Sequence, residues 1–265
     1  KKELTVALLA KRFEVLKNPG NRNNEIGLPL TVLELTEQHQ YAVLEMGFYV
    51  PGEIRTLCEI AHPHVGVITN IGTVHAERAG SQEVIAQGKA ELVQSLPPGP
   101  EGVAVLNLDD PWVKGMAEKT SADVFSYGIN QKADLMAANI ILQGLNGVTM
   151  TLAYRGKEYH VRSPLLGAFS AYTILRASSV ALIEGLDWET IKAGIAKEQI
   201  DLRMRKFSLP NGITILDDTY NASPASTIAA LELLDKLEGR KIAILGDMLE
   251  LGQYEQSGHQ QVGAR

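Results

Sequence analysis

Several acidic residues and one histidine stand at the ends of short apolar runs, where their side chains could bind a cation or a phosphate-bearing ligand. Glu45 ends the run YAVLEMG, and His75 lies in the loop after HVGVITNIG. Further carboxylates end the later apolar runs: Asp109, Asp110, Asp217, Asp218 and Asp247. Open α/β sheets bind ligands at the carboxyl ends of parallel strands, so Glu45 and His75 together are candidates to ligate a divalent ion. Alternatively, these residues cap the helices or turns that follow, and spacing alone leaves both interpretations open.

Two other local patterns carry weaker signals. His62 and His64 have the spacing of a metal-binding pair on an extended chain, but no third ligand stands near them in sequence, so we interpret them as structural. Gly88-Lys89 and Gly156-Lys157 lack the following Ser or Thr and the earlier Gly of a P-loop. The sequence contains neither a Walker A motif nor GxGxxG. From spacing alone, Lys89 is an ordinary surface lysine of a helix.

The runs that carry the acidic residues are expected to be buried parallel strands. They are rich in Val, Ile and Leu, too short for helices, and separated by helical patterns such as residues 81–95. Strands that alternate with helices indicate an α/β sheet. Further along, residues 148–154 and 159–161 alternate around a turn at Arg155-Gly156, which predicts an antiparallel hairpin added to the parallel sheet. A helix-rich stretch from about Ser170 to Lys197 follows.

A second α/β unit is expected to begin near Leu202. Its expected elements are a strand at ITILDDTY, a helix from Pro224 to Leu237 and a strand at KIAILGDM. Two strands cannot complete a doubly wound domain, so we expect this unit to continue beyond Arg265.

Composition and charge restrict the class of protein. The chain has 265 residues, 45% hydrophobic and 21% charged, with a formal net charge of −6. Interspersed charges without a basic patch argue against nucleic-acid binding. A single cysteine, Cys58, allows no internal disulfide and fits a reducing cytoplasmic compartment. No apolar run approaches the roughly 20 residues that span a bilayer. The opening residues fit an amphipathic helix, with Leu4, Ala7 and Leu8 on one side.

Five longer strings narrow the interpretation. They occur in the order GNRNNEIGLPLT, LEMGFYVPGEI, ITNIGTVHAERAGSQEVIAQGKAEL, LDDTYNASPAST and LGDMLELG. Together they closely resemble the Mur ligases, and the resemblance runs from the first residue to the last. It implies that residues 1–200 form a mostly parallel-sheet, P-loop-type ATPase domain with the hairpin extension. Residues 201–265 would then begin an incomplete, Rossmann-like C-terminal domain.

The resemblance also implies a reaction, a cofactor and substrates. In this family ATP phosphorylates a carboxylate and an amine attacks the acyl phosphate. The strings DDTYNASP and GDMLELG are most similar to the members that add D-alanyl-D-alanine to UDP-N-acetylmuramoyl-tripeptide. Phosphoryl transfer depends on positioning and charge neutralisation, for which the family uses Mg²⁺. We expect a cytoplasmic monomer with no nucleic-acid partner and no membrane insertion.

The resemblance assigns roles to particular residues. Glu45 and His75 match the family's magnesium ligands, and Lys89 matches the lysine that is carbamylated in this family. Because carbamylation requires a neutral amine, Lys89 should lie where its pKa falls below the usual value of about 10.4. The positions that match nucleotide-contacting or neighbouring residues are Arg203, Asp218, Tyr220, Asn221, Asn23 and Asn24. Turn stabilisation, which Asn and Asp favour, is the alternative role for these residues.

Departures from the family pattern keep two alternatives open. The family's phosphate-binding GKTTT is expected before Lys1, so the chain by itself is expected to be inactive. Phe169 stands where relatives usually have a histidine near the adenine, which puts the adenine contacts in doubt. The alternatives are a Mur-type ligase with a different incoming amine and a non-catalytic module that binds nucleotide or a partner. Glu45, His75, Lys89, Arg203 and Asp218 together favour the enzyme, because a binding module has no evident need for all five.

Overall fold

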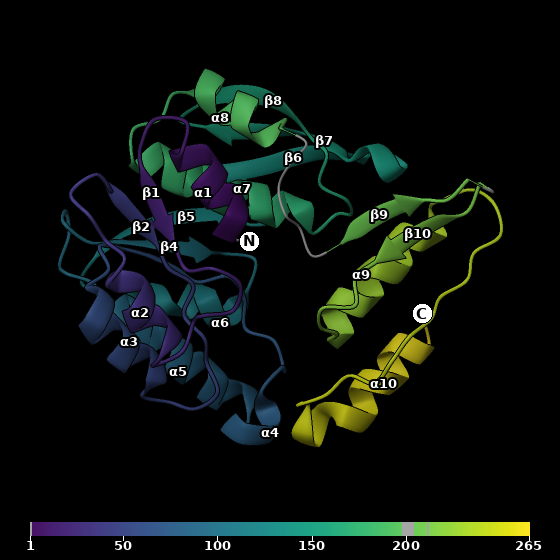
Figure 1. The fold of residues 1–265 in the computed structure, drawn as a ribbon, viewed down its shortest axis with the longest axis horizontal. Helices are drawn as coiled ribbons and strands as arrows, with labels where there is room; N and C mark the ends of the chain where they lie inside the picture. Colours follow the sequence, from purple (N-terminus) through teal and green to yellow (C-terminus); the bar gives the residue numbers. More distant parts are fainter. Residues whose placement is uncertain (1, 198–203, 211) are drawn as a thin grey trace.

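The computed structural model describes residues 2–197, 204–210 and 212–265 (Figure 1). The main sheet has six strands in the order β3-β4-β5-β6-β7-β8. Strands β3 to β6 run parallel, whereas β7 is antiparallel to both β6 and β8. The strands are β3 (Val65–Val67), β4 (Val103–Asn107), β5 (Asp123–Gly128), β6 (Leu135–Leu142), β7 (Val148–Tyr154) and β8 (Lys157–Ser163). The predicted fold class is confirmed: a mainly parallel sheet carries an antiparallel hairpin.

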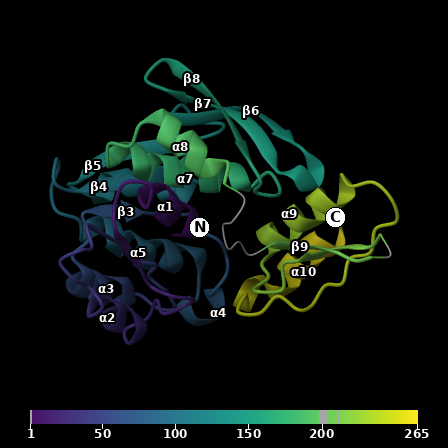
Figure 2. The same cartoon turned by 45° about the horizontal axis from the view of Figure 1, so that its top comes forward.

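Helices cover both faces of this sheet, as Figure 2 shows from a second direction. Successive residues of β4 point to opposite faces: Val105 belongs to one buried cluster, and Ala104 and Leu106 belong to another. The first cluster lies under α1 (Lys2–Leu9), α7 (Ser170–Ile183) and α8 (Trp188–Ile195). The second lies under α3 (Glu53–Ala61), α5 (Gln82–Gln94), α6 (Pro111–Lys114) and the 3₁₀ helix η1 (Gly115–Lys119). Leu4 and Leu8 are fully buried, so the predicted amphipathic helix at the start of the chain is confirmed.

A separate pair of parallel strands lies beside the main sheet. It consists of β1 (Val15–Lys17) and β2 (Tyr41–Val43), connected through α2 (Gly27–Val32). Because the two strands are parallel, the residues that follow each of them leave the pair at the same end. The short helix α4 (Ala76–Ala79) follows the loop after β3.

The residues after 203 form a second part with its own small cluster, around Met248, Leu251 and Val262. Strands β9 (Arg205–Ser208) and β10 (Thr214–Asp217) make an antiparallel hairpin. They are followed by α9 (Pro224–Asp235), the 3₁₀ helix η3 (Gly252–Tyr254) and α10 (Glu255–Gly263). The other 3₁₀ helix, η2 (Gly144–Asn146), joins β6 to β7. The expected boundary between residues 200 and 201 lies outside the described residues.

The predicted strand at KIAILGDM is wrong. Residues 241–248 have no regular secondary structure, and Ile244 is 94% exposed. A strand is held by hydrogen bonds to a neighbouring strand, and β9 and β10, the nearest candidates in sequence, pair with each other. The apolar pattern is therefore present without a ladder to join.

No helix among the described residues is long and apolar enough to cross a membrane. The predicted helices and hairpin of the first part are confirmed at 82–94, 170–183, 188–195 and 148–163. Helix α5 begins where expected because the Ser81 side chain accepts a hydrogen bond from the Val84 N–H.

Candidate active site

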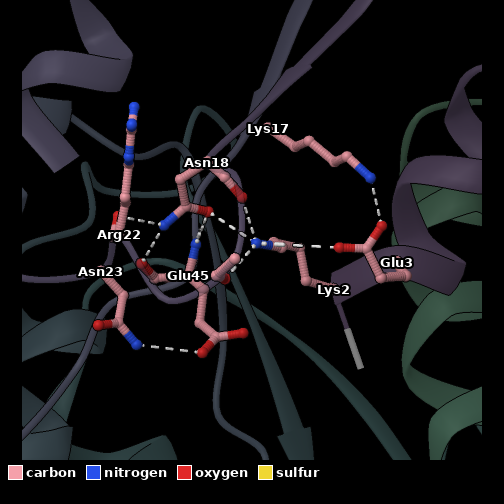
Figure 3. Close-up of polar contacts among 8 residues, drawn as sticks. Lys2, Glu3, Lys17, Asn18, Arg22, Asn23 and Glu45 are labelled. Carbon is pink, nitrogen blue, oxygen red and sulfur yellow. Dashed lines mark hydrogen bonds and ion pairs between the residues drawn. The ribbon is translucent and has the colours of Figure 1, made fainter. Parts of the chain in front are cut away.

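Glu45 is positioned by the chain that follows β1 (Figure 3). Asn18, fully buried just after β1, accepts a hydrogen bond from the Glu45 N–H at 3.0 Å and donates to the Glu45 carbonyl at 2.9 Å. The same amide also donates to the Arg22 carbonyl at 2.8 Å. Because β1 and β2 are parallel, Asn18 and Glu45 emerge at the same end of the pair. The amide thus fixes the backbone from which the Glu45 carboxylate projects.

Asn23 holds the Glu45 side chain itself. Its Nδ2 donates to Glu45 Oε1 at 3.1 Å, and its carbonyl accepts from the Gly47 N–H at 2.7 Å. Glu45 Oε2 accepts no hydrogen bond from the residues that the structure describes, so one carboxylate oxygen remains for a ligand. The Asn24 side chain accepts a hydrogen bond from the Gly27 N–H at 2.8 Å, a local turn contact where α2 begins.

Lys2 brings a nearly buried ammonium group to the same network. Only 7% of its side chain is exposed. Its Nζ donates to the backbone carbonyl of Asn18, to Asn18 Oδ1 at 3.3 Å and to the Gly20 carbonyl at 3.4 Å. Sequence reasoning missed both Lys2 and Asn18. The position of Asn18 at a strand end is the same signal that identified the acidic residues, applied to an uncharged side chain.

His75 is held in a turn at the start of α4. Its backbone has a φ of +72°, a left-handed conformation that costs a non-glycine residue on the order of 1–3 kcal/mol. Its Nδ1 lies 2.5 Å from Oε2 of Glu250, a residue of the second part. The imidazole and the Tyr49 ring pack in a T-shaped arrangement with 5.1 Å between centroids, and the Arg78 guanidinium lies 4.6 Å from the centroid of the Tyr49 ring. The imidazole is thus fixed on two sides.

Lys89 projects from α5 toward the end of β3. Its Nζ donates to the Asn70 carbonyl at 3.1 Å. Part of the side chain reaches solvent, yet enough protein surrounds the ammonium that desolvation lowers its pKa, an effect that the carboxylate of Asp110 opposes. The predicted direction of the pKa shift is the one that the structure supports. The neutral amine is therefore more accessible here than at an ordinary surface lysine.

One loop, residues 44–50, connects the three candidate ligands. Glu45 lies within it, and Tyr49 packs on His75. Phe48 packs against α5 at Gly88, the residue before Lys89, where an added Cβ would lie only 2.1 Å from Phe48 Cε2. The loop thus contacts both segments that carry the other two residues. Among the described residues, however, no three His, Cys, Asp or Glu side chains are grouped as a ready-made cation site.

The carboxylate of this set fits a hard cation such as Mg²⁺, and the imidazole nitrogen adds a softer ligand. Glu45 offers an uncommitted carboxylate oxygen, and His75 has its Nε2 opposite the nitrogen that faces Glu250. Lys89, once carbamylated, would add a second anionic group. This set is smaller than a complete coordination sphere, as expected for Mg²⁺, which retains water and takes ligands from phosphates.

Two of the strand-end acids have the alternative role. Asp109 accepts hydrogen bonds from the backbone N–H groups of residues 129–131 and from the Tyr172 hydroxyl at 3.0 Å. Asp110 caps α6 and accepts from the Ile71 N–H at 2.8 Å, which anchors the loop after β3. These carboxylates build the edge of the sheet on which the candidate site stands.

His62 and His64, which have the spacing of a metal-binding pair, lie in surroundings that fit a structural role. His62 ends α3 in a left-handed conformation, and His64 lies 3.8 Å from Glu101 with both side chains exposed.

Four of the residues predicted for the nucleotide site stand at or after position 203, and they stay predictions. Arg203 lies outside the described residues. Asp218 follows β10, Tyr220 is 63% exposed, and the Asn221 side chain accepts from the Ala222 N–H at 2.8 Å, which is a local turn contact. Phe169 lies at the start of α7, half exposed, with its ring 6.3 Å from that of Tyr172.

Comparison with known proteins finds Mur ligase domains in both parts of the chain. The family model described as Mur ligase middle domain matches residues 1–181, and that described as Mur ligase, glutamate ligase domain matches residues 202–265. Two relatives named UDP-N-acetylmuramoyl-tripeptide–D-alanyl-D-alanine ligase are 36% identical (Synechocystis) and 38% identical (Mycobacterium tuberculosis H37Rv). They match 100% and 99% of this chain, which spans 56% and 52% of their lengths.

Solved structures are similar over the same extent. MurF from Acinetobacter baumannii is 31% identical with a TM-score of 0.92, matching 99% of this chain and 57% of its own. MurF ligase from Thermotoga maritima in complex with ADP is 28% identical with a TM-score of 0.87, matching 99% of this chain and 60% of its own. The chain therefore spans little more than half the length of the proteins it matches. With its middle-domain match covering most of the residues, the chain belongs to the Mur ligase family.

Proposed function

We propose that the protein carrying this chain joins D-alanyl-D-alanine to UDP-N-acetylmuramoyl-tripeptide in an ATP- and Mg²⁺-dependent reaction. The observation that carries the proposal is the end-to-end similarity to relatives of that name. The geometry of the 44–50 loop supports the same conclusion, because it gathers the segments that bear Glu45, His75 and Lys89. The ADP bound to the similar ligase from Thermotoga maritima fits the use of ATP.

In the proposed reaction, ATP phosphorylates the terminal carboxylate of the tripeptide and the amine of D-alanyl-D-alanine displaces phosphate from the acyl phosphate. Mg²⁺, held by Glu45, His75 and carbamylated Lys89, would neutralise charge on the transferring phosphoryl group. Asn18 holds the backbone of Glu45 and Asn23 its carboxylate, so the side chain is already oriented and would hold a cation there. Desolvation of Lys89 favours the neutral amine, whose nitrogen would attack CO₂ and release a proton to give the carbamate.

The remaining assignments belong to the same proposal. Residues 1–200 act as the central ATP-binding domain and residues 201–265 as the start of the C-terminal domain. Arg203, Asp218, Tyr220 and Asn221 would contact or shape the nucleotide site from that second domain, with Asn23 and Asn24 on the opposite side. The enzyme would work as a cytoplasmic monomer, with neither nucleic acid nor membrane as a partner.

Phosphate release by the intact enzyme, measured with ATP, the UDP-linked tripeptide and a panel of amines, tests the substrate assignment. D-Alanyl-D-alanine should support turnover and single amino acids should not. Rapid turnover with a single amino acid would favour a sister ligase. No turnover with any amine, together with retained nucleotide binding, would favour the non-catalytic module.

Substitutions test the cation site. Glu45→Ala and His75→Ala should abolish phosphate release, whereas the matched surface variants Glu101→Ala and His64→Ala should leave it unchanged. Near-normal turnover of either site variant would remove that residue from the site. Lys89→Ala should lose activity that short carboxylic acids partly restore, and full activity without them would reject the carbamate.

A further inference from the structure

A carboxylate from the second part of the chain contacts the imidazole of the candidate cation site in the first part. His75 Nδ1 and Glu250 Oε2 are 2.5 Å apart, although the residues are separated by 175 positions in sequence. Both side chains are mostly shielded, with 28% and 33% exposed. In Figures 1 and 2 alike, α4 lies against the start of the segment that leads into α10. The proposed reaction assigns no role to this contact between His75 and Glu250.

The chemistry of the two groups determines the direction of the hydrogen bond. An ionised carboxylate only accepts, so Nδ1 of His75 must carry the proton that it donates to Glu250. In the neutral ring, this leaves the lone pair on Nε2. Imidazoles that ligate metals characteristically donate their other ring N–H to a carboxylate or carbonyl, which fixes the tautomer and the ring orientation.

We infer that Glu250 is a positioning residue that holds His75 in the Nδ1–H tautomer with Nε2 available to a divalent cation. The inference rests on the proposed function, since it takes His75 to be a cation ligand. The cation site would then be completed by Glu250, a residue from the second part of the chain. Seating of that part and assembly of the cation site are therefore coupled through one hydrogen bond.

The backbone around Glu250 is built to present this side chain. Its φ of +63° is left-handed, as is the backbone of His75 with a φ of +72°. The Glu250 carbonyl accepts from the Glu77 N–H at 3.2 Å, and the Gln253 side chain donates to the Gly80 carbonyl at 3.0 Å. Gly252 lies so close to Glu77 that an added Cβ would be 2.8 Å from its Cα. These contacts seat the segment without using the Glu250 carboxylate.

The neighbouring groups leave that carboxylate to His75. The Arg78 guanidinium, the basic group on α4, lies over the Tyr49 ring, and that ring packs against the imidazole. The ring of His75 thus packs against an aromatic ring and is hydrogen-bonded to a carboxylate. This arrangement is expected where the direction of Nε2 matters, because packing alone would not select between tautomers.

The test uses the intact protein with ¹⁵N-labelled histidine, in which NMR distinguishes the two neutral tautomers. The chain has six histidines, so His75→Ala identifies the resonance of His75. At a mildly alkaline pH, the wild type should show His75 as the Nδ1–H tautomer. Glu250→Ala should shift the ring toward the Nε2–H form that a free imidazole favours. The dissociation constant of the Glu250→Ala variant for Mn²⁺, measured by electron paramagnetic resonance, should rise about 10–100-fold.

Two matched variants separate positioning from simple docking. Gln253→Ala removes a contact of the same interface that does not involve His75, and should leave both the tautomer and the Mn²⁺ affinity unchanged. Glu250→Gln keeps an oxygen that can accept from Nδ1–H, and should restore much of both. An unchanged tautomer and an unchanged Mn²⁺ affinity in Glu250→Ala would overturn the inference, as would a wild-type His75 in the Nε2–H form.

The outcome also separates this inference from the proposed function. If His75→Ala retains normal Mn²⁺ binding and turnover, the cation role of His75 fails, and the tautomer measurement still shows whether Glu250 orients the ring. If His75→Ala loses both while Glu250→Ala loses neither, the cation role stands and the positioning role is rejected.

Discussion

Replacing Asn18 by alanine should both destabilise the protein and weaken its affinity for divalent cations. Asn18 is fully buried, and its amide makes three short hydrogen bonds, to the Glu45 N–H, the Glu45 carbonyl and the Arg22 carbonyl, at 3.0, 2.9 and 2.8 Å. Alanine removes all three and leaves the backbone partners without the amide. No other side chain in the network of Figure 3 contacts both backbone groups of Glu45.

The size of the effect follows from these bonds. A typical hydrogen bond contributes about 0.5–1.5 kcal/mol net, and a buried group left without a partner costs about 1–3 kcal/mol. Allowing for partial access of water to the loop, we expect a loss of about 2–4 kcal/mol. At roughly 2–4 °C per kcal/mol for a chain of this size, the thermal midpoint should fall by about 4–16 °C. A displaced Glu45 should raise the dissociation constant for Mn²⁺ by about 10–100-fold.

Thermal unfolding and Mn²⁺ titration of three variants check this reasoning. Asn130→Ala is the matched control, because Asn130 is exposed, and it should change stability by less than about 0.5 kcal/mol. Asn18→Asp keeps the oxygen that accepts from Glu45 but loses both donated bonds and places an oxygen against two carbonyls. The Lys2 ammonium, 3.3 Å from Oδ1, would pair with the new carboxylate and offset part of this loss, so aspartate should fall between alanine and the wild type. If Asn18→Ala has the same thermal midpoint as the control variant, or if Asn18→Asp has the same midpoint as the wild type, the amide does not hold Glu45 in place.

Three further predictions follow from the titratable groups. Desolvation lowers the pKa of Lys89 in the folded protein, so the unfolded chain binds more protons. In CO₂-free buffer, Lys89→Met should therefore raise the free energy of unfolding at pH 7. This gain in stability should shrink as the pH approaches the unfolded pKa of about 10.4. The hydrogen bond to Glu184 raises the pKa of Tyr41 to about 12, so the difference in stability between wild type and Tyr41→Phe should be constant below about pH 10 and should change, against the wild type, as the pH rises toward 12. Burial raises the pKa of the Cys58 thiol to about 11, so iodoacetamide should label it at mildly alkaline pH only after unfolding, and rapid labelling of the folded protein would contradict this placement.

The parts of the fold that were predictable are those in which a local pattern agrees with its surroundings. Strands β2 and β3 lie within the predicted runs YAVLEMG and HVGVITNIG, and the hairpin turn at Arg155-Gly156 is where the alternation breaks. Strand β6 was missed because its pattern is interrupted: its register shifts between Ala138 and Ile141, and Asn139 has a φ of +51°. A bulge of this kind moves later side chains to the other face, so the period of two is lost.

The wrong strand at 241–248 shows the opposite failure. Its sequence has the apolar character of a buried strand, yet Ile244 is almost fully exposed because no strand of the described residues pairs with it. Local pattern reports what a segment can do, whereas strand formation depends on a partner elsewhere in the chain. The contact between His75 and Glu250 was unpredictable for a related reason, since only tertiary structure brings the two residues together.

The three candidate ligands differ in how they are held, and the difference follows from charge. Neutral amides orient Glu45: Asn18 fixes its backbone and Asn23 takes one carboxylate oxygen, so its negative charge stays available to a cation. A metal-binding His75 would be neutral, and its carboxylate partner would increase the basicity of the other ring nitrogen. Lys89 must lose its charge before it can become a carbamate, and desolvation favours that loss. A cation in place of Glu250 would oppose the proposed role of His75, because it would withdraw electron density from the nitrogen that would bind the metal.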